Sequence, residues 1–152
     1  MDTAQETFAA LRRAHHGNCF VCGSAVPKGL GLDVTLHPDG SVSATFPCDD
    51  AFTGYDGRVH GGTLASLMDG AMVNCLFARG LVAYTAELQV RYRRPVRTAV
   101  PAQIRAWVER SGCRLHVLRG EILQEAEIVV TARGKFLELP AARVKTASSS
   151  RS

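Results

Sequence analysis

An acidic residue inside an apolar segment is the most unusual chemical feature of this sequence. Asp69 lies within residues 64–78, where leucine, methionine, alanine and valine recur at helical spacing around the whole circumference. A helix that is apolar on all sides is expected to be buried. Because a lone buried carboxylate costs free energy, we interpret Asp69 as a group that is paired, neutralised or retained for chemistry.

A glycine-rich loop, residues 54–62, precedes this helix and ends in His-Gly-Gly at positions 60–62. The first N–H groups of a helix have no acceptor within the helix, and glycine lets a ligand approach them closely. Together with the positive end of the helix dipole, these donors bind an anion or a polarised carbonyl oxygen. A tight turn that needs glycine only for its backbone geometry is the alternative.

The elements that must position these groups follow from periodicity and turn signals. Thr63 is expected to cap the long helix, and Gly80 fits the left-handed position after its end. Residues 3–14 form a short amphipathic pattern, and Gly120 is interpreted as the site of a β-bulge. Alternating side chains predict strands over residues 30–37, 41–46, 85–93, 102–108, 114–122 and 128–136. These elements predict an α+β domain in which an antiparallel sheet wraps one helix.

The loop and the helix together carry the pattern G-x-x-G-x-V-H-G-G-x-x-A-x-L-x-D at residues 54–69. This pattern resembles the hotdog-fold acyl-CoA thioesterases of the phenylacetate-pathway type, and the resemblance extends over residues 19–137. It implies an antiparallel sheet of five to six strands around one long central helix. The expected organisation is an N-terminal segment (1–18), a hotdog domain (19–140) and a disordered tail (141–152).

The resemblance also implies an activity, the hydrolysis of a coenzyme A thioester to the free acid and CoA. Asp69 would activate water or attack directly, while the Gly61 N–H polarises the carbonyl oxygen. Thr85 matches a serine or threonine that helps to position the water. His60 is expected to organise the loop rather than to transfer protons. No cofactor is required, because CoA is part of the substrate.

Substrate binding is assigned to the same loop and to the basic residues that follow the strand at 85–93. Gly62 and Tyr55 are the loop candidates, and Arg93 and Arg94 are the cationic groups expected near the phosphates of CoA. An exposed strand face is the alternative explanation for the arginines. Many relatives carry asparagine where this chain has Gly54, which leaves Tyr55 or Asp56 as substitutes.

Composition limits the partners. The chain has 152 residues and a net charge of +4, but three of these charges lie in residues 141–152, so nucleic-acid binding is not expected. No apolar run is long enough to span a membrane and no secretory signal precedes the domain, so a cytoplasmic location is expected. The resemblance implies a homodimer or a dimer of dimers, with Gly61 of one subunit facing Asp69 and Thr85 of the other.

The C-x-x-C-G sequence at Cys19 and Cys22, with a histidine three residues before it, has metal-like spacing. A structural zinc needs four ligands, and Cys48 or His37 would have to complete the set from a distance. Small cysteines packed in a turn are therefore preferred, and no metal is expected. The histidines outside the glycine-rich loop are expected at the surface: His15, His16, His37 and His116.

Two alternative functions remain open. A hydratase or dehydratase on the same fold would use His60 as a base and would hydrate an enoyl-CoA. A non-catalytic acyl-CoA-binding module is the interpretation favoured if Gly54 has cost the site its activity.

Overall fold

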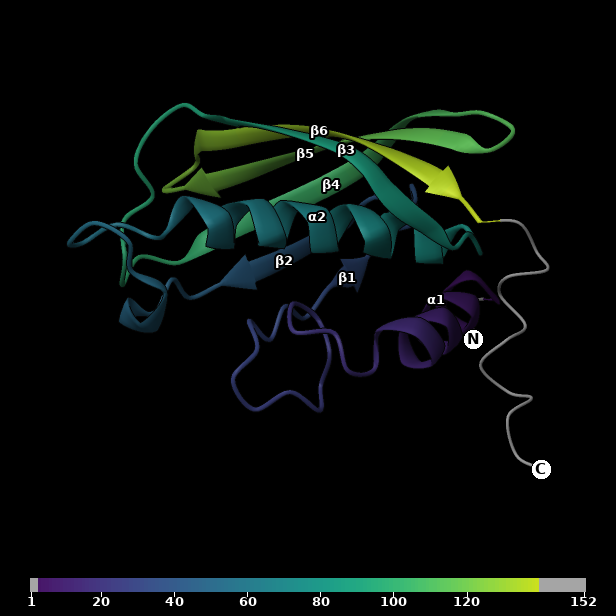
Figure 1. Ribbon diagram of the computed structural model, residues 1–152, viewed down its shortest axis with the longest axis horizontal. Coiled ribbons are helices and arrows are strands. Elements are labelled where there is room, and N and C mark those ends of the chain that lie inside the picture. The colour runs from purple at the N-terminus through teal and green to yellow at the C-terminus, as the bar shows by residue number, and fades with distance from the viewer. Residues whose placement is uncertain (1–2, 140–152) are drawn as a thin grey trace.

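A single antiparallel sheet of six strands curves around one long helix in the computed structural model, which describes residues 3–139 (Figure 1). The strands follow the order β1-β2-β4-β5-β6-β3 across the sheet. The elements are α1 (Thr3–His16), β1 (Thr35–Leu36), β2 (Val42–Phe46), the 3-10 helix η1 (Asp50–Phe52), α2 (Gly61–Ala78), β3 (Ala83–Tyr92), β4 (Ala102–Ser111), β5 (Leu115–Gln124) and β6 (Glu127–Glu138). This arrangement confirms the expected α+β hotdog fold. The predicted tail lies outside the described residues.

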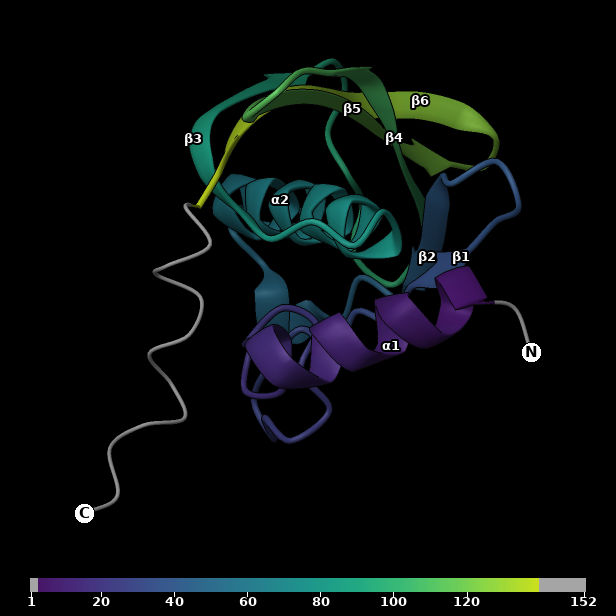
Figure 2. The same cartoon turned by 90° about the vertical axis from the view of Figure 1, so that its right-hand side faces the viewer.

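Helix α2 lies in the hollow of the sheet, and its side chains are buried along most of its length (Figure 2). Its N-cap is His60 rather than the predicted Thr63, because the His60 ring accepts a hydrogen bond from the Gly62 N–H. After the helix ends, Gly80 has a φ of 74°, so its predicted left-handed conformation is confirmed.

The contact between α2 and the sheet explains a glycine that the sequence pattern misassigned. Gly120 of β5 pairs regularly with its neighbours, and the register shifts occur elsewhere, so the predicted bulge is wrong. A Cβ atom at Gly120 would lie 3.0 Å from the sulfur of Met68. Glycine fits here because the methionines of α2 approach the strand closely, and a side chain would displace them.

The N-terminal segment packs on the side of α2 that faces away from the sheet (Figure 2). The helix predicted over residues 3–14 is confirmed as α1, and Arg12 donates hydrogen bonds to the carbonyls of Cys22 and Leu32, both at 2.9 Å. The predicted strand at 30–37 shortens to β1, because the Leu30 and Leu32 N–H groups donate to the loop at residues 20–21 instead.

Strand β3 forms one edge of the sheet, and most of its side chains are exposed on both faces. Tyr84, for example, is 65% exposed. A strand of ten residues with a free edge is a template for pairing with another strand. Among the described residues, no helix is both long enough and apolar enough to cross a membrane.

Three histidines predicted at the surface are half-buried or buried: His16, His37 and His116. His116 is only 2% exposed and lies between the Ser111 hydroxyl (2.6 Å) and the Glu138 carboxylate (3.1 Å). His16 is half-buried against the ring of Phe77, with the ring centroids 5.0 Å apart. Both ring nitrogens of His116 have partners inside the fold, and the His16 Nδ1 contacts the Cys22 sulfur at 3.4 Å, which sequence spacing alone did not indicate.

Candidate active site

Asp69 is held by a short hydrogen bond from the neighbouring edge strand. The Thr85 hydroxyl donates to Asp69 Oδ1 at 2.6 Å, which is at the short end of the range for O–H···O hydrogen bonds. Asp69 is half-buried on α2, and Thr85 is exposed on β3. No described residue donates to the second carboxylate oxygen, so Oδ2 is available to a water or a substrate.

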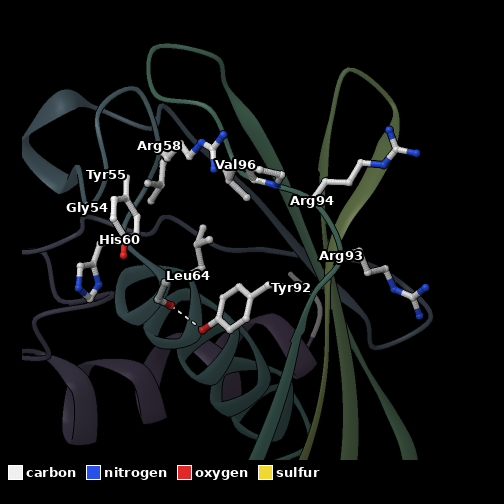
Figure 3. A pocket seen from close by; sticks show the side chains of 12 residues that line it. Gly54, Tyr55, Arg58, His60, Leu64, Tyr92, Arg93, Arg94 and Val96 are labelled. Atoms are coloured by element: carbon white, nitrogen blue, oxygen red, sulfur yellow. Dashed lines mark hydrogen bonds between the residues drawn. The ribbon is translucent and has the colours of Figure 1, made fainter.

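The loop before α2 leaves one backbone donor free. His60 Nδ1 accepts the Gly62 N–H at 2.9 Å, and the Gly61 carbonyl accepts the Tyr92 hydroxyl at 2.7 Å (Figure 3). Within residues 3–139, no group accepts a hydrogen bond from the Gly61 N–H. This N–H therefore meets the geometric requirement for an oxyanion donor, since it is fixed by the helix and unpaired.

The Gly61 donor opens into a cleft of about 730 Å³ (Figure 3). Leu64 and Tyr92 lie on its apolar walls, and Tyr92 also connects β3 to the helix start. Partial burial raises the pKa of the Tyr92 phenol, which therefore remains a hydrogen-bond donor at neutral pH. The lining residues are Gly54, Tyr55, Arg58, Val59, His60, Gly61, Leu64, Tyr92, Arg93, Arg94, Pro95 and Val96.

The predicted site residues fall into two separate groups. Tyr55, His60, Gly61, Arg93 and Arg94 line the cleft, whereas Gly62, Asp69 and Thr85 do not. Gly61 and Asp69 are eight residues apart on one helix, which corresponds to about 12 Å along its axis. A single chain therefore does not bring the oxyanion donor and the carboxylate to the same carbonyl group.

Gly54 packs directly against the loop that caps α2. A Cβ atom at this position would lie 3.2 Å from the Cα of His60 and 3.4 Å from its ring. A side chain as large as asparagine would have to displace His60 from its capping position or project into the cleft. Two residues were proposed to substitute for the missing asparagine. Tyr55 lines the cleft, whereas Asp56 lines a second cavity that adjoins it.

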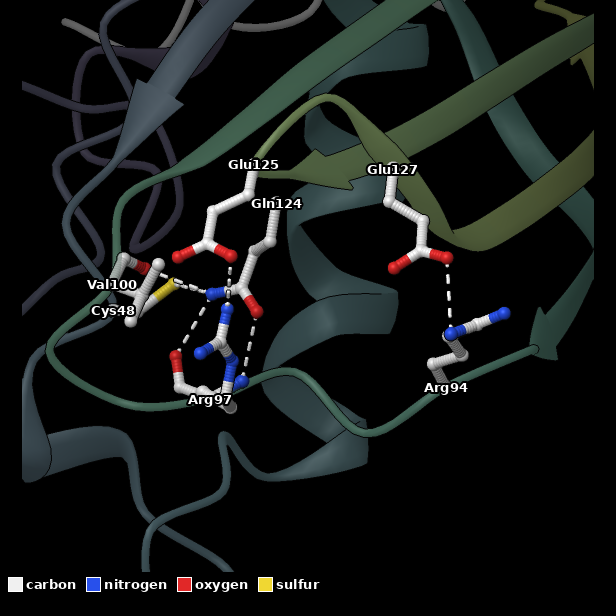
Figure 4. A network of polar contacts seen from close by, with 7 residues as sticks. All are labelled: Cys48, Arg94, Arg97, Val100, Gln124, Glu125 and Glu127. Carbon is white, nitrogen blue, oxygen red and sulfur yellow. Dashed lines mark hydrogen bonds and ion pairs between the residues drawn. The ribbon is translucent and has the colours of Figure 1, made fainter.

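The basic residues at the cleft differ in how far they are already paired. Arg94 forms an ion pair with Glu127 at 3.0 Å, and the Arg93 Nε donates to Thr131 at 3.3 Å (Figure 4 shows the Arg94 pair). Arg58 lines both the cleft and an adjoining cavity of about 640 Å³, and no described residue pairs with its guanidinium. Sequence analysis missed Arg58 and Tyr92. The position of Arg58 inside the loop motif was the only available signal.

Gln124 lines the adjoining cavity and holds the loop beside it in place. Gln124 is nearly fully buried, accepts the Arg97 N–H at 3.0 Å and donates to the carbonyls of Arg97 and Val100, each at 2.9 Å (Figure 4). Arg97 also forms an ion pair with Glu125 at 3.0 Å. Both polar atoms of the Gln124 amide are hydrogen-bonded to the backbone of the loop at residues 97–100, so this residue fixes that loop.

Comparison with known proteins identifies the family. A sequence model of the thioesterase superfamily matches residues 56–131, which is half of the chain, and the chain belongs to this superfamily. No curated protein matches the sequence.

Three solved structures show the likeness. A thioesterase superfamily protein is 26% identical to this chain, with a TM-score of 0.74. The match covers 78% of this chain and 62% of that protein, so this chain spans less than two thirds of it. The E. coli PaaI protein from the phenylacetic acid degradation operon is 23% identical with a TM-score of 0.77, and the match covers 91% of this chain and 97% of PaaI. A hypothetical thioesterase from Streptococcus pneumoniae, solved with coenzyme A, is 20% identical with a TM-score of 0.67, and the match covers 71% of this chain and 85% of that protein. At these identities, the last two structures show a likeness of fold alone.

Proposed function

We propose that the protein hydrolyses acyl-CoA thioesters to the free acid and CoA at a site shared by two subunits. The observation that carries this proposal is the 2.6 Å bond between Thr85 and Asp69, which holds a carboxylate beside a free sheet edge. The second support is the unpaired Gly61 N–H at the start of the same helix. Both are the groups that thioester hydrolysis requires, a base and an oxyanion donor.

In this mechanism the thioester carbonyl oxygen binds to the Gly61 N–H. Thr85 holds one carboxylate oxygen of Asp69, and the other oxygen accepts a proton from the attacking water. A C–O bond forms, negative charge develops on the carbonyl oxygen, and the N–H donor stabilises it by about 3 kcal/mol. The intermediate then collapses, the C–S bond breaks, and CoA leaves as the thiol after taking the proton from Asp69.

The site requires two chains because of the separation along α2. A second copy that pairs through β3 would bring its Gly61 toward the Thr85 and Asp69 of the first copy. The exposure of β3 on both faces supports this pairing, since such an edge is otherwise a site of aggregation. We therefore propose a homodimer with two equivalent sites, related by twofold symmetry. Assembly into a dimer of dimers stays a prediction.

Coenzyme A binding is assigned to the cleft and the cavity beside it. Arg58 borders both, and its unpaired guanidinium is suited to a bidentate contact with a phosphate. Arg93 has capacity for a second contact, because only its Nε is engaged by a described residue. The streptococcal protein with the same fold was solved with coenzyme A, which supports this ligand class.

The geometry of His60 argues against the hydratase alternative. Because Nδ1 accepts the Gly62 N–H, the neutral ring carries its proton on Nε2. Neither nitrogen is then a free base unless the helix cap breaks.

A cytoplasmic location stays a prediction.

A panel of acyl-CoA substrates with a thiol-reactive dye tests the proposal. We expect release of free CoA by the wild type and loss of this release in Asp69→Asn. Hydration of an enoyl-CoA without CoA release would instead establish the hydratase. Binding of acyl-CoA without any turnover would establish the non-catalytic module.

A further inference from the structure

A second cluster of chemically active side chains lies beside α2, where α1 ends. The ligand atoms of His16, Cys19 and Cys22 all lie within 4.8 Å of one another. The His16 Nδ1 is 3.4 Å from the Cys22 sulfur. Sequence analysis noted the spacing of these residues, but the structure shows that the fold brings all three ligand atoms to one point.

These distances can be compared with those of a tetrahedral zinc site. Zinc–sulfur bonds of about 2.3 Å and zinc–nitrogen bonds of about 2.05 Å give ligand separations of about 3.6 Å for N···S and about 3.8 Å for S···S. The observed 3.4 Å between His16 and Cys22 is close to the first value. Two sulfur ligands and one imidazole are the donor set that favours zinc over hard cations such as magnesium or calcium.

The backbone of this cluster is held in place by several contacts. The Gly23 N–H donates to the Cys19 carbonyl at 2.7 Å, and the Cys19 N–H donates to the His16 carbonyl at 3.2 Å. Val21 presses the turn onto α2 at Gly70, where a Cβ atom would lie 2.5 Å from a Val21 methyl. The turn therefore presents its two thiols in a fixed orientation rather than on a loose loop.

An unsatisfied polar atom near the cluster is the independent observation. Asn74 is 0% exposed, and its Nδ2 donates to the Gly70 carbonyl at 2.7 Å, yet its Oδ1 has no partner. The Asn74 amide also lies within interaction range of the Cys22 thiol. A buried acceptor without a donor costs free energy, so an orphaned oxygen on a side chain beside Cys22 indicates a missing group.

We propose that His16, Cys19 and Cys22 bind a zinc ion through Nδ1 and two thiolate sulfurs, with Asn74 Oδ1 at the fourth position, directly or through a bound water. The two distant residues considered from the sequence are engaged elsewhere: His37 contacts Ser43 at 2.7 Å, and the Cys48 thiol points to the Phe46 carbonyl. The ion would tie the end of α1, the turn and the middle of α2 together, which is a structural role.

Metal analysis of the full chain, purified without an affinity tag or chelator under reducing conditions, tests this proposal. We expect about one zinc per chain, and loss of the metal in Cys19→Ser and Cys22→Ser. Cys113→Ser is the matched control, because Cys113 is exposed and outside the cluster, and it should retain the metal. Asn74→Ala should weaken zinc binding by roughly 10- to 100-fold in competition with a chromophoric chelator.

Thiol labelling of the wild type keeps the test valid if the cysteine variants fail to fold. Zinc should slow the labelling of Cys19 and Cys22, and a strong chelator should restore it while lowering the melting temperature. Less than a tenth of a metal ion per chain after incubation with zinc would overturn the proposal, as would labelling rates that zinc does not change. A Cys19–Cys22 disulfide in the protein as purified would also overturn it. Neither readout depends on whether the protein hydrolyses thioesters.

Discussion

Replacing Gly61 with proline removes the oxyanion donor while leaving the surrounding backbone in place. Gly61 is the first residue of α2, a position at which proline is favoured because the lost N–H has no helical partner. The preceding His60 has a φ of −59° and a ψ of 132°, the extended conformation that a following proline requires. A Cβ atom at Gly61 would lie 3.5 Å from the Tyr92 ring, which is an ordinary contact.

The expected effect of Gly61→Pro is on turnover rather than on folding. Loss of one preorganised donor typically reduces kcat by roughly 10²- to 10³-fold, equivalent to about 3 to 4 kcal/mol. The assay is CoA release at saturating acyl-CoA, with circular dichroism and thermal unfolding measured in parallel. Gly61→Ala is the control, because it adds the same Cβ atom but keeps the N–H.

Gly61→Ala should retain kcat within a few-fold of the wild type. If a folded Gly61→Pro variant turned over at the wild-type rate, the Gly61 N–H would not be the oxyanion donor. Equal losses in both variants would show that the Cβ atom, and not the missing donor, is responsible.

Three further predictions concern the acid and the thiols. Thr85→Val removes a hydrogen bond to a carboxylate that is present in the resting protein, so the melting temperature should fall by several degrees. If the same bond also positions Asp69 in the transition state, kcat should fall by roughly 10- to 150-fold, equivalent to about 1.5 to 3 kcal/mol; an unchanged kcat would exclude Thr85 from the mechanism. If Asp69 acts as a base, a single turnover in ¹⁸O-labelled water should place the label in the product acid, whereas label in the Asp69 carboxylate would establish direct attack. Burial raises the pKa of Cys48 to about 11 and that of Cys75 to about 12, above their ordinary value of 9.0. A thiol reagent at pH 8 should therefore modify the exposed Cys113 first, and rapid labelling of Cys75 in the folded protein would contradict its burial. The stability that the buried Cys48 and Cys75 thiols contribute should be lost as the pH rises from 9 toward 12.

The long helix and the sheet around it could be predicted from the sequence, because periodicity directly reflects burial. Asp69 was singled out by its apolar neighbours alone. Its pairing with Thr85, sixteen residues away, was not accessible from periodicity, since it depends on how β3 passes the helix. That pair was anticipated only through the family resemblance.

Other features depend on local geometry that residue types do not specify. Thr63 and His60 are both able to cap a helix, and the choice was decided by where the loop turns. His116 was misplaced although a signal existed, because it lies in phase with Leu118, Gly120 and Ile122, which face the core. The role of Asn74 was hidden, since only the folded chain places it beside Cys22.

Subunit complementation tests most directly the claim that each site joins two chains. Gly61→Pro and Asp69→Asn chains are co-expressed with different tags, and the heterodimers are purified through both. Each heterodimer then holds one site with both defects and one site with neither, so we expect about half of the wild-type turnover, although each homodimer is inactive. Heterodimers as inactive as the two parents would show that the donor and the acid act within a single chain, which would contradict the account.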